Sequence, residues 1–330
     1  MGVRREDFLY IGSKNGPERV LVTAEGVEFH GISCGKLRRY LSFDNFWDFF
    51  KIPVGIVQSF FQILSFRPKV IFCKGGYVSF PVAVAGFLAR VPVILHESDL
   101  VPGLANRLTA RFAKYILVSF EESKAYFPHK KVLVTGNPVR GEIMLGNREK
   151  ALEATGFTQD LPVVLVMGGS LGATKVNEAL WRELAQILHH YQVIHICGTG
   201  KVGNGAGITS DINLRKRYKS YEYVTHQLKD FYALTDVFVT RAGANSLAEI
   251  SALGKPSLLI PLSKAASRGD QIDNAKAFKK HHTTIVIEED KLENGSILKA
   301  LQELTLGANN SPKGRPNRAA ERIAKIIFEL

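Results

Sequence analysis

Short apolar runs alternate along this chain with glycine-rich turns and with segments whose apolar residues recur at helical spacing. The segment Pro162–Met167 is a continuous apolar run, as expected of a strand that is buried on both faces. Strands that alternate with amphipathic helices predict parallel sheets with helices on both faces. We therefore expect an α/β fold, with strands near residues 70–73, 92–95, 131–134, 163–167, 193–197, 236–240 and 257–261.

The chain has more of these units than one small sheet holds, and its 330 residues suit two domains of ordinary size. A turn at residues 135–140 and the polar stretch 141–159 interrupt the pattern before a new strand begins at Pro162. The tail, 315–330, has the pattern of an amphipathic helix. We predict an N-terminal domain over 1–139, a C-terminal domain over 140–312, and a final segment, 313–330, whose helix packs back on the N-terminal domain.

Charge and composition narrow the function without fixing it. Lysine and arginine exceed the acids by twelve, and the pI is about 9.5, which favours an anionic partner such as a phosphorylated substrate or an anionic lipid. No motif that reads bases accompanies this charge, so nucleic acid is not expected as a partner. The start lacks the apolar stretch of a signal peptide, and no apolar run reaches the ~20 residues of a spanning helix. We expect a cytoplasmic protein that can lie on a membrane.

Three glycine-containing or polar turns in the C-terminal half each follow a predicted strand. The first, 168–173, precedes a helix whose free N–H groups and dipole favour a phosphate, and Ser170 can add a hydroxyl donor or cap the helix. The second, 241–246, precedes a helix with Glu249, a carboxylate suited to a ribose diol or simply to the helix dipole. The third leads to Gln271 and Asn274, whose amides suit sugar hydroxyls or form a polar helix face. Together the three turns favour a nucleotide-sugar site.

Two polar segments of the first domain also follow strands. Lys74–Ser79 links a strand to a helix, and His96–Asp99 follows the run 92–95. One of these groups can orient or deprotonate an acceptor hydroxyl, or the pair His96–Glu97 can hold a loop through hydrogen bonds. Two open α/β sheets side by side would leave a cleft at the carboxyl ends of their strands, where ligands bind in such folds.

The segment 43–66 is apolar on two helical faces, although a helix that covers a core needs only one. The second face either forms a membrane-surface patch, with basic residues just upstream, or is buried between the sheet and other helices. Pro53 is expected to kink or divide the helix. One face contains Phe46, Phe50, Val54, Val57, Phe61 and Leu64; the other contains Phe49, Ile52, Ile56, Phe60 and Ile63.

The ordered motifs together resemble the MurG family, the UDP-N-acetylglucosamine:lipid I N-acetylglucosaminyltransferases of peptidoglycan synthesis. The Ser-Arg-Gly-Asp-Gln form at 267–271 is most similar to the Gram-positive variant. The motifs that carry the resemblance are Lys-Gly-Gly-Tyr-Val-Ser at 74–79, His-Glu-Ser-Asp at 96–99, Pro-Gly-Leu-Ala-Asn at 102–106, Thr-Gly-Asn-Pro-Val-Arg at 135–140, Gly-Gly-Ser-Leu-Gly-Ala at 168–173, Arg-Ala-Gly-Ala-Asn at 241–245 and Gly-Asp-Gln-Ile-Asp-Asn-Ala at 269–275.

The resemblance implies a GT-B fold of two Rossmann-like domains, with the donor held mainly by the C-terminal domain and lipid I by the N-terminal one. It implies inverting transfer of N-acetylglucosamine from UDP-N-acetylglucosamine to the muramoyl 4-hydroxyl, without a metal or other cofactor, by a peripheral enzyme on the cytoplasmic face of the membrane.

The resemblance also assigns roles to individual residues. Arg140 and Ser170 would contact the UDP phosphates, Glu249 the ribose, and the backbone near Thr225 the uracil. Gln271 and Asn274 would bind the N-acetylglucosamine hydroxyls. Glu97 and Asp99 are candidates for the catalytic base, and Asp99 stands where many members have asparagine. Gly169, Gly172, Ala244 and Asn106 complete the expected substrate-binding set.

One feature departs from the family pattern. Members begin with a strand and a glycine-rich loop ending in histidine, whereas this chain starts near Phe8–Gly12, which resembles the second strand. We therefore expect a first domain without its first strand and loop, with an exposed edge or a gap in its sheet.

Three other functions share part of this pattern. A related transferase would use a different lipid acceptor, such as diacylglycerol, and a sugar-nucleotide 2-epimerase would share the fold without needing the apolar segment 43–66. A non-catalytic UDP-sugar-binding or scaffold protein of the cell-wall machinery would keep the donor motifs alone.

Overall fold

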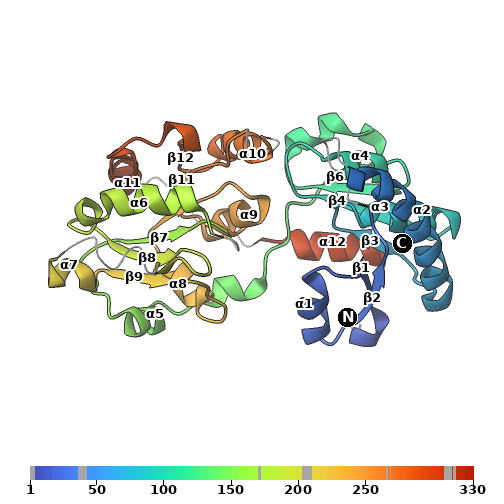
Figure 1. The fold of residues 1–330 in the computed structure, drawn as a ribbon, viewed down its shortest axis with the longest axis horizontal. Coiled ribbons are helices and arrows are strands. Elements are labelled where there is room, and N and C mark those ends of the chain that lie inside the picture. Colours follow the sequence, from blue (N-terminus) through green and yellow to red (C-terminus); the bar gives the residue numbers. More distant parts are fainter. Residues whose placement is uncertain are drawn as a thin grey trace. The chain divides into compact units, whose positions relative to one another are not determined.

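The computed structural model describes residues 4–35, 43–169, 172–202, 210–264, 267, 269–307, 314 and 317–330, with only the backbone of 43–50 and of His129. The chain divides into two compact units, each with its own core (Figure 1). The first contains Met1–Gly136 and Glu321–Leu330, and the second contains Asn137–Ala320.

The first unit has two parallel sheets. Its strands are β1 (Leu9–Ser13), β2 (Glu28–Ile32), β3 (Ile71–Cys73), β4 (Val93–Glu97), β5 (Tyr115–Val118) and β6 (Val132–Val134). Its helices are α1 (Glu18–Ala24), α2 (Phe43–Phe66), α3 (Ser79–Leu88), α4 (Leu104–Thr109), α12 (Ala319–Phe328) and the 3₁₀ turns η1 (Arg5–Asp7), η2 (Glu121–Tyr126) and η3 (His129–Lys131). One sheet has the order β1-β2 and the other the order β3-β4-β5-β6.

The break between these sheets leaves two strand edges without a neighbour. Among the described residues, β1 pairs only with β2 and β3 pairs only with β4. Nevertheless Ile11, Ile32 and Ile71 contribute to one apolar cluster, so both sheets share a core. The structure therefore has the interrupted first sheet that we expected from the sequence.

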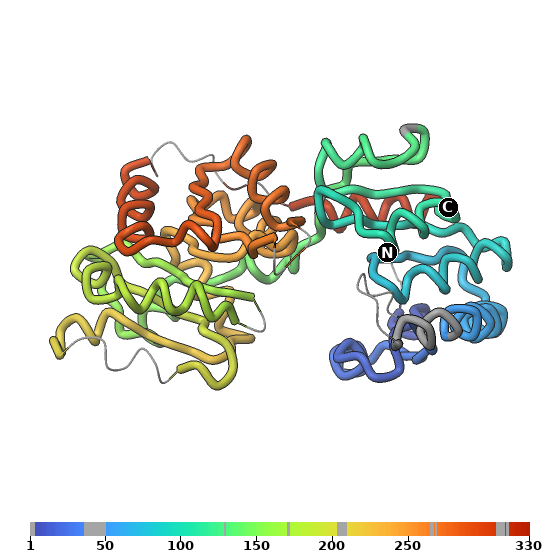
Figure 2. Tube along the Cα trace, turned by 45° about the horizontal axis from the view of Figure 1, so that its top comes forward, coloured from blue at the N-terminus to red at the C-terminus, as the bar shows by residue number. Residues whose placement is uncertain are grey.

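Helices cover the four-stranded sheet on both faces. Val93 and Leu95 of β4 pack in the cluster that α2 and α3 close, whereas Ile94, which points the other way, packs with Leu117 and with Ile323 of α12. The red helix α12 accordingly lies beside the strands of the first unit in both views (Figures 1 and 2). All five residues of β4 are buried, as expected of a strand covered on both faces.

Helix α2 runs through Pro53 without a break, so the proline does not divide it. Its two apolar faces have different surroundings. Ile63 is buried in the core, with Ile56 and Phe60 packed beside it. The other face remains exposed and contains Val54, Val57, Phe61 and Leu64. The predictions for Phe46, Phe49 and Phe50 concern side chains outside the described part.

The second unit has one parallel sheet of six strands in the order β12-β11-β10-β7-β8-β9. The strands are β7 (Val163–Met167), β8 (Gln192–Ile196), β9 (Tyr218–Tyr221), β10 (Val237–Thr240), β11 (Ser257–Leu259) and β12 (Thr284–Val286). The helices are α5 (Arg148–Thr155), α6 (Thr174–Ile187), α7 (Ile212–Lys216), α8 (Leu228–Leu234), α9 (Ala244–Leu253), α10 (Asp270–Lys279), α11 (Ser296–Gly307) and the 3₁₀ turns η4 (Gly141–Leu145) and η6 (Glu289–Lys291).

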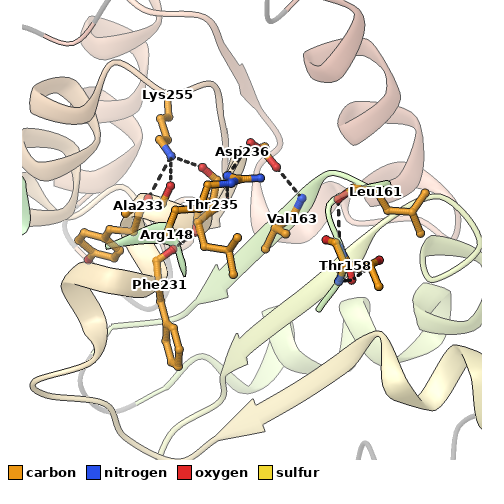
Figure 3. Close-up of polar contacts among 12 residues, drawn as sticks. Arg148, Thr158, Leu161, Val163, Phe231, Ala233, Thr235, Asp236 and Lys255 are labelled. Atoms are coloured by element: carbon orange, nitrogen blue, oxygen red, sulfur yellow. Dashed lines mark hydrogen bonds and ion pairs between the residues drawn. The ribbon is translucent and has the colours of Figure 1, made fainter. Parts of the chain in front are cut away.

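The C-terminal end of α8 is held by two cationic side chains from other parts of the second unit (Figure 3). The Lys255 ammonium donates to the carbonyls of Tyr232 (3.0 Å), Ala233 (3.2 Å) and Thr235. Arg148 donates to the Leu234 carbonyl at 2.9 Å. These cations satisfy carbonyls that a helix end leaves unpaired, and they complement the negative end of its dipole.

Candidate functional site

The carboxyl ends of β7 and β10 form the topological switch point of the second sheet. After β7 the chain moves to β8 on one side, whereas β10 lies on the other side of β7. Where the loops after two neighbouring strands lead in opposite directions, a crevice remains between them, and folds of this kind bind their ligands there. The turns 168–173 and 241–244 follow these two strands, and residues 260–269 follow the next strand, β11. The predicted donor motifs therefore share one edge of one sheet.

The turn after β7 requires its glycines. Gly169 and Gly172 have φ of +89° and +70°, in the left-handed region that favours glycine. A Cβ on Gly172 would lie 2.3 Å from the Cys197 carbonyl oxygen, whereas a Cβ on Gly169 would meet nothing within 4 Å. The helix that follows, α6, has no side-chain cap at Ala173. Exposed backbone and an uncapped helix start are the features that an anion needs. Ser170 lies outside the described residues.

Glu249 is fixed on α9 between a phenol and a guanidinium. Tyr232 donates its O–H to Glu249 Oε2 at 2.8 Å, and Arg140 NH2 lies 3.8 Å from Glu249 Oε1. Burial raises the pKa of the Glu249 carboxyl, while Tyr232 and Arg140 both act to lower it. Arg140 itself is half-exposed and also lies 3.6 Å from Glu142. Two predicted donor residues, Arg140 and Glu249, are therefore adjacent.

The two predicted amides lie on α10 as expected, but both make contacts within the protein. Gln271 Oε1 accepts a hydrogen bond from the Leu262 backbone at 3.0 Å. Asn274 is fully buried and donates to the Ala242 carbonyl at 3.3 Å, so it holds the turn after β10. Ala244 is the first residue of α9, and exposed Thr225 lies between β9 and α8, where its carbonyl accepts from Leu228 N at 3.1 Å.

The sequence interpretation assigned no role to two groups next to these residues. Tyr232 belongs to the buried face of α8, a segment that the sequence analysis did not single out. Arg241, buried at the end of β10, donates to the Ile260 carbonyl at 3.1 Å and pairs with Glu289. The signal available in the sequence was an arginine directly after an apolar strand, because an arginine buried at such a place requires a partner for its charge.

In the first unit, a hydrogen-bonded cluster joins β3, β4 and α4. Glu97 Oε2 accepts from Asn106 Nδ2 at 2.6 Å, and Glu97 Oε1 accepts from the Asp99 backbone N–H at 2.9 Å. Asn106 Oδ1 in turn accepts from Gly76 N at 3.2 Å. His96 and Glu97 lie inside β4 rather than after it, which corrects the predicted strand end. Glu97 is buried, and burial raises the pKa of its carboxyl. Asp99 is only partly buried.

A lysine and a histidine lie beside this cluster. His96 Nε2 is 2.9 Å from the Gly136 carbonyl, which can only accept, so Nε2 carries the proton. The lone pair on His96 Nδ1 then accepts from Lys74 Nζ at 3.1 Å, and Ser98 Oγ lies 3.1 Å from the same ammonium. Burial lowers the pKa of His96 to about 4 and that of Lys74 to about 8. The histidine is therefore neutral at pH 7 and serves as an acceptor.

The geometry of the second unit thus fits a phosphate at the turn after β7 and a diol at Glu249, as in nucleotide-binding α/β proteins. Among the side chains that the structure describes, no three histidine, cysteine or acidic residues gather as metal ligands. None of the described helices is long and apolar enough to cross a membrane.

The comparisons identify the class as a glycosyltransferase. The glycosyltransferase family 28 N-terminal domain matches residues 2–118, and the family 28 C-terminal domain matches residues 163–330. The chain belongs to glycosyltransferase family 28.

A curated relative from Bacillus thuringiensis (strain Al Hakam) is 44% identical over 299 residues, covering 91% of this chain and 83% of the relative. It is named UDP-N-acetylglucosamine--N-acetylmuramyl-(pentapeptide) pyrophosphoryl-undecaprenol N-acetylglucosamine transferase 3. The resemblance to the MurG family is therefore confirmed.

Two solved structures support the fold. The crystal structure of Acinetobacter baumannii MurG has a TM-score of 0.70 at 20% identity, covering 97% of this chain and 90% of that one. UDP-GlcNAc 2-epimerase from Neisseria meningitidis has a TM-score of 0.62 at 14% identity, with coverages of 98% and 91%. At these identities the likeness concerns the fold alone, and it confirms the predicted class of two Rossmann-like units.

Proposed function

We propose that this chain transfers N-acetylglucosamine from UDP-N-acetylglucosamine to the muramoyl 4-hydroxyl of an undecaprenyl-diphospho-muramoyl-pentapeptide, which converts lipid I to lipid II. The observation that carries the proposal is the arrangement of donor motifs around the β7–β10 switch point in a chain of family 28. The name of the Bacillus relative supports the same donor and acceptor.

In this proposal the diphosphate of the donor lies at the turn 168–173. Gly169 and Gly172 bring the backbone close, Ser170 adds its hydroxyl, and the start of α6 offers N–H groups. Arg140, which is half-exposed beside Glu249, neutralises the charge that develops as UDP leaves. Glu249 accepts from the ribose diol.

We assign the remaining donor contacts to residues near the same edge of the second sheet. The backbone near Thr225 contacts uracil, and the start of α9 at Ala244 faces the diphosphate. Gln271 binds sugar hydroxyls, because its oxygen already accepts from Leu262 N while its amide nitrogen offers donors. Asn274 supports the site through the Ala242 carbonyl.

The chemical step is an inverting displacement. The acceptor oxygen forms a bond to the anomeric carbon, the bond to the UDP oxygen breaks with its electron pair, and a base takes the hydroxyl proton. Of the two candidate carboxylates, Glu97 accepts hydrogen bonds at both oxygens, whereas Asp99 is more exposed. We therefore assign the base first to Asp99, with Glu97 and Asn106 holding the acceptor-side loop.

The proposed acceptor carries a long lipid, so we propose that the enzyme works at the membrane surface, on its cytoplasmic face. The exposed stripe of α2, with Val54, Val57, Phe61 and Leu64, supplies an apolar face at helical spacing, and Lys51 and Arg67 are exposed beside it. Phe61→Ser is expected to reduce sedimentation with vesicles that contain anionic phospholipid. Leu306→Ser, at an exposed leucine of α11, is the matched control, and equal losses in both variants would count against the stripe.

The test of the function is transfer of labelled N-acetylglucosamine from its UDP donor to a lipid I analogue. Glu249→Gln should weaken UDP binding by about tenfold, because the amide loses charge and one acceptor. Glu303→Gln, at an exposed position of α11, should leave binding and transfer unchanged.

The possible results separate the alternatives. Absence of UDP binding would refute the donor site. UDP binding without transfer to lipid I or to any other acceptor would favour a binding or scaffold protein, transfer to diacylglycerol would reassign the acceptor, and a released 2-epimer of the sugar nucleotide would reassign the reaction.

A further inference from the structure

We infer that Tyr232 is a positioning residue of the donor site, which fixes one oxygen of Glu249 so that the carboxylate presents the other to the ribose. The inference deepens the proposed function and rests on it. Tyr232 does not reach the predicted ligand itself; it acts through Glu249.

The contacts of Tyr232 define this role. The side chain is fully buried on α8, and its ring packs edge-on against Phe238 of β10 with a centroid distance of 5.3 Å. The phenol therefore has one well-defined direction, and its O–H donates to Glu249 Oε2 at 2.8 Å. The sulfur of Met167, at the end of β7, lies 3.6 Å from the same hydroxyl. The two strands of the switch point thus orient the phenol.

The position of α8 is itself fixed. Lys255 Nζ donates to the Tyr232 carbonyl at 3.0 Å and to the carbonyls of Ala233 and Thr235, and Figure 3 shows Lys255 beside Ala233 and Thr235. Both the backbone and the side chain of Tyr232 are therefore fixed by other groups, as a positioning role requires.

The second Glu249 oxygen has a different environment. Oε1 lies 3.8 Å from Arg140 NH2, too far for a hydrogen bond, and Arg140 is exposed enough to move. The carboxylate is thus anchored at Oε2 and paired only loosely at Oε1. A ribose hydroxyl that donates to Oε1 would replace a weak ion pair and would leave the anchored oxygen undisturbed.

The Tyr232 hydrogen bond also favours the ionised form of the Glu249 carboxyl. Burial raises the pKa of Glu249, and the Tyr232 hydrogen bond and the Arg140 charge oppose it. Helix α10 and the turn η4 also pack on α9. Their charged groups are Asp270, Asp273, Lys276 and Lys279 on α10 and Glu142 on η4, whose carboxylate lies 3.6 Å from Arg140. Removal of the phenolic O–H raises the Glu249 pKa further, and a protonated carboxyl accepts hydrogen bonds less well.

The test compares UDP with 2′-deoxy-UDP by calorimetric titration of the full chain and of Tyr232→Phe. The wild type should prefer UDP by about tenfold, because the diol reaches an oriented carboxylate. In Tyr232→Phe this preference should fall to about twofold, mainly through weaker UDP binding. The loss should grow as the pH decreases, since the raised pKa of Glu249 then leaves more of this carboxyl protonated.

Two comparisons distinguish positioning from general damage. Tyr191→Phe removes another buried hydroxyl of the same unit, which lies 3.2 Å from Thr305 Oγ1, and should leave the UDP preference and its pH profile unchanged. In a Glu249→Gln background, Tyr232→Phe should have no further effect on this preference. In transfer assays, Tyr232→Phe should raise KM for UDP-N-acetylglucosamine about fivefold with little change in kcat.

Equal losses for UDP and 2′-deoxy-UDP, or a full additional loss in the Glu249→Gln background, would overturn the inference while leaving the donor site in place. Failure of the wild type to bind UDP would overturn both.

Discussion

At the scale of single residues, buried polar side chains hold the turns that follow the strands. In the first unit Asn106 connects Gly76 to Glu97, and Glu97 connects Asn106 to Asp99. Gly75 is required there, because its φ is +101° and a Cβ would lie 2.7 Å from Asn106 Nδ2. In this series of hydrogen bonds each atom either donates or accepts. Exchanging the donor and the acceptor between two of the side chains therefore tests the series.

We predict that Glu97→Gln lowers the free energy of unfolding of the first unit by about 2 kcal/mol, because the new amide turns a donor towards either Asn106 Nδ2 or the Asp99 N–H. The double variant Glu97→Gln/Asn106→Asp restores the pattern: the introduced glutamine donates to the introduced aspartate, and both side chains still accept from the backbone. Denaturant unfolding should show the double variant within about 0.5 kcal/mol of the wild type.

The same pair of variants decides the role of Glu97 in transfer. Recovered stability together with recovered transfer would mean that Glu97 holds the loop, as we propose. Recovered stability without transfer would instead assign the base to Glu97. A double variant as unstable as the single one would contradict the hydrogen-bond pattern itself.

At the scale of elements, the C-terminal end of α8 shows how a short helix can be held by side chains from other elements. Burial lowers the Lys255 pKa to about 8, and the Asp236 charge opposes this shift, so the amine remains mainly protonated at pH 7. Its three carbonyl partners lie in the last turn of α8 and at its C-cap, where a helix leaves carbonyls without an intrahelical partner.

We predict that Lys255→Met lowers the free energy of unfolding of the second unit by about 3 kcal/mol, because the methionine fills the space but leaves buried carbonyls unpaired. Lys216→Met, at an exposed lysine of α7, should change it by less than about 0.5 kcal/mol. Thermal unfolding monitored by circular dichroism measures both, and similar values for the two variants would count against the role of the cap.

The elements themselves were largely predictable. The strongly apolar run at 163–167 became β7 with the same bounds, and most other predicted strands agree within one or two residues. Strands β2, β5, β9 and β12 were not identified. β9, Tyr218–Tyr221, has only partly buried residues and a polar sequence, so its strand character depends on pairing with β8 rather than on an apolar pattern.

The site was predictable at the level of motifs but not of contacts. Glycine turns and Glu249 are visible in the sequence because of their spacing after strands. Tyr232 lies 17 residues before Glu249, on another helix, and a buried tyrosine in an apolar face has no sequence signal for its hydroxyl partner. The two faces of α2 show the same limit: the pattern gives two apolar stripes, and only packing against α3 decides which one is buried.

At the scale of the whole molecule, the chain forms two units, and the clusters of buried apolar residues described in them share no residue. Ile323 belongs to a cluster with Ile94 and Leu117 in the first unit, and Leu304 belongs to the cluster of the second. The first unit is discontinuous in sequence, because Glu321–Leu330 belongs to it. The last ten residues therefore contribute to the stability of the unit that the first 136 residues form.

We predict two unfolding transitions that respond to different changes. Ile323→Ala should lower the stability of the first unit by about 2–4 kcal/mol and Leu304→Ala that of the second by a similar amount, because each removes a large buried side chain. UDP at about 100 times its Kd should stabilise only the second unit, by about 2.7 kcal/mol. Scanning calorimetry with and without UDP measures all three effects. If Ile323→Ala and UDP shift the same transition, the two units unfold together, and the donor site then draws stability from the C-terminal helix of the other unit.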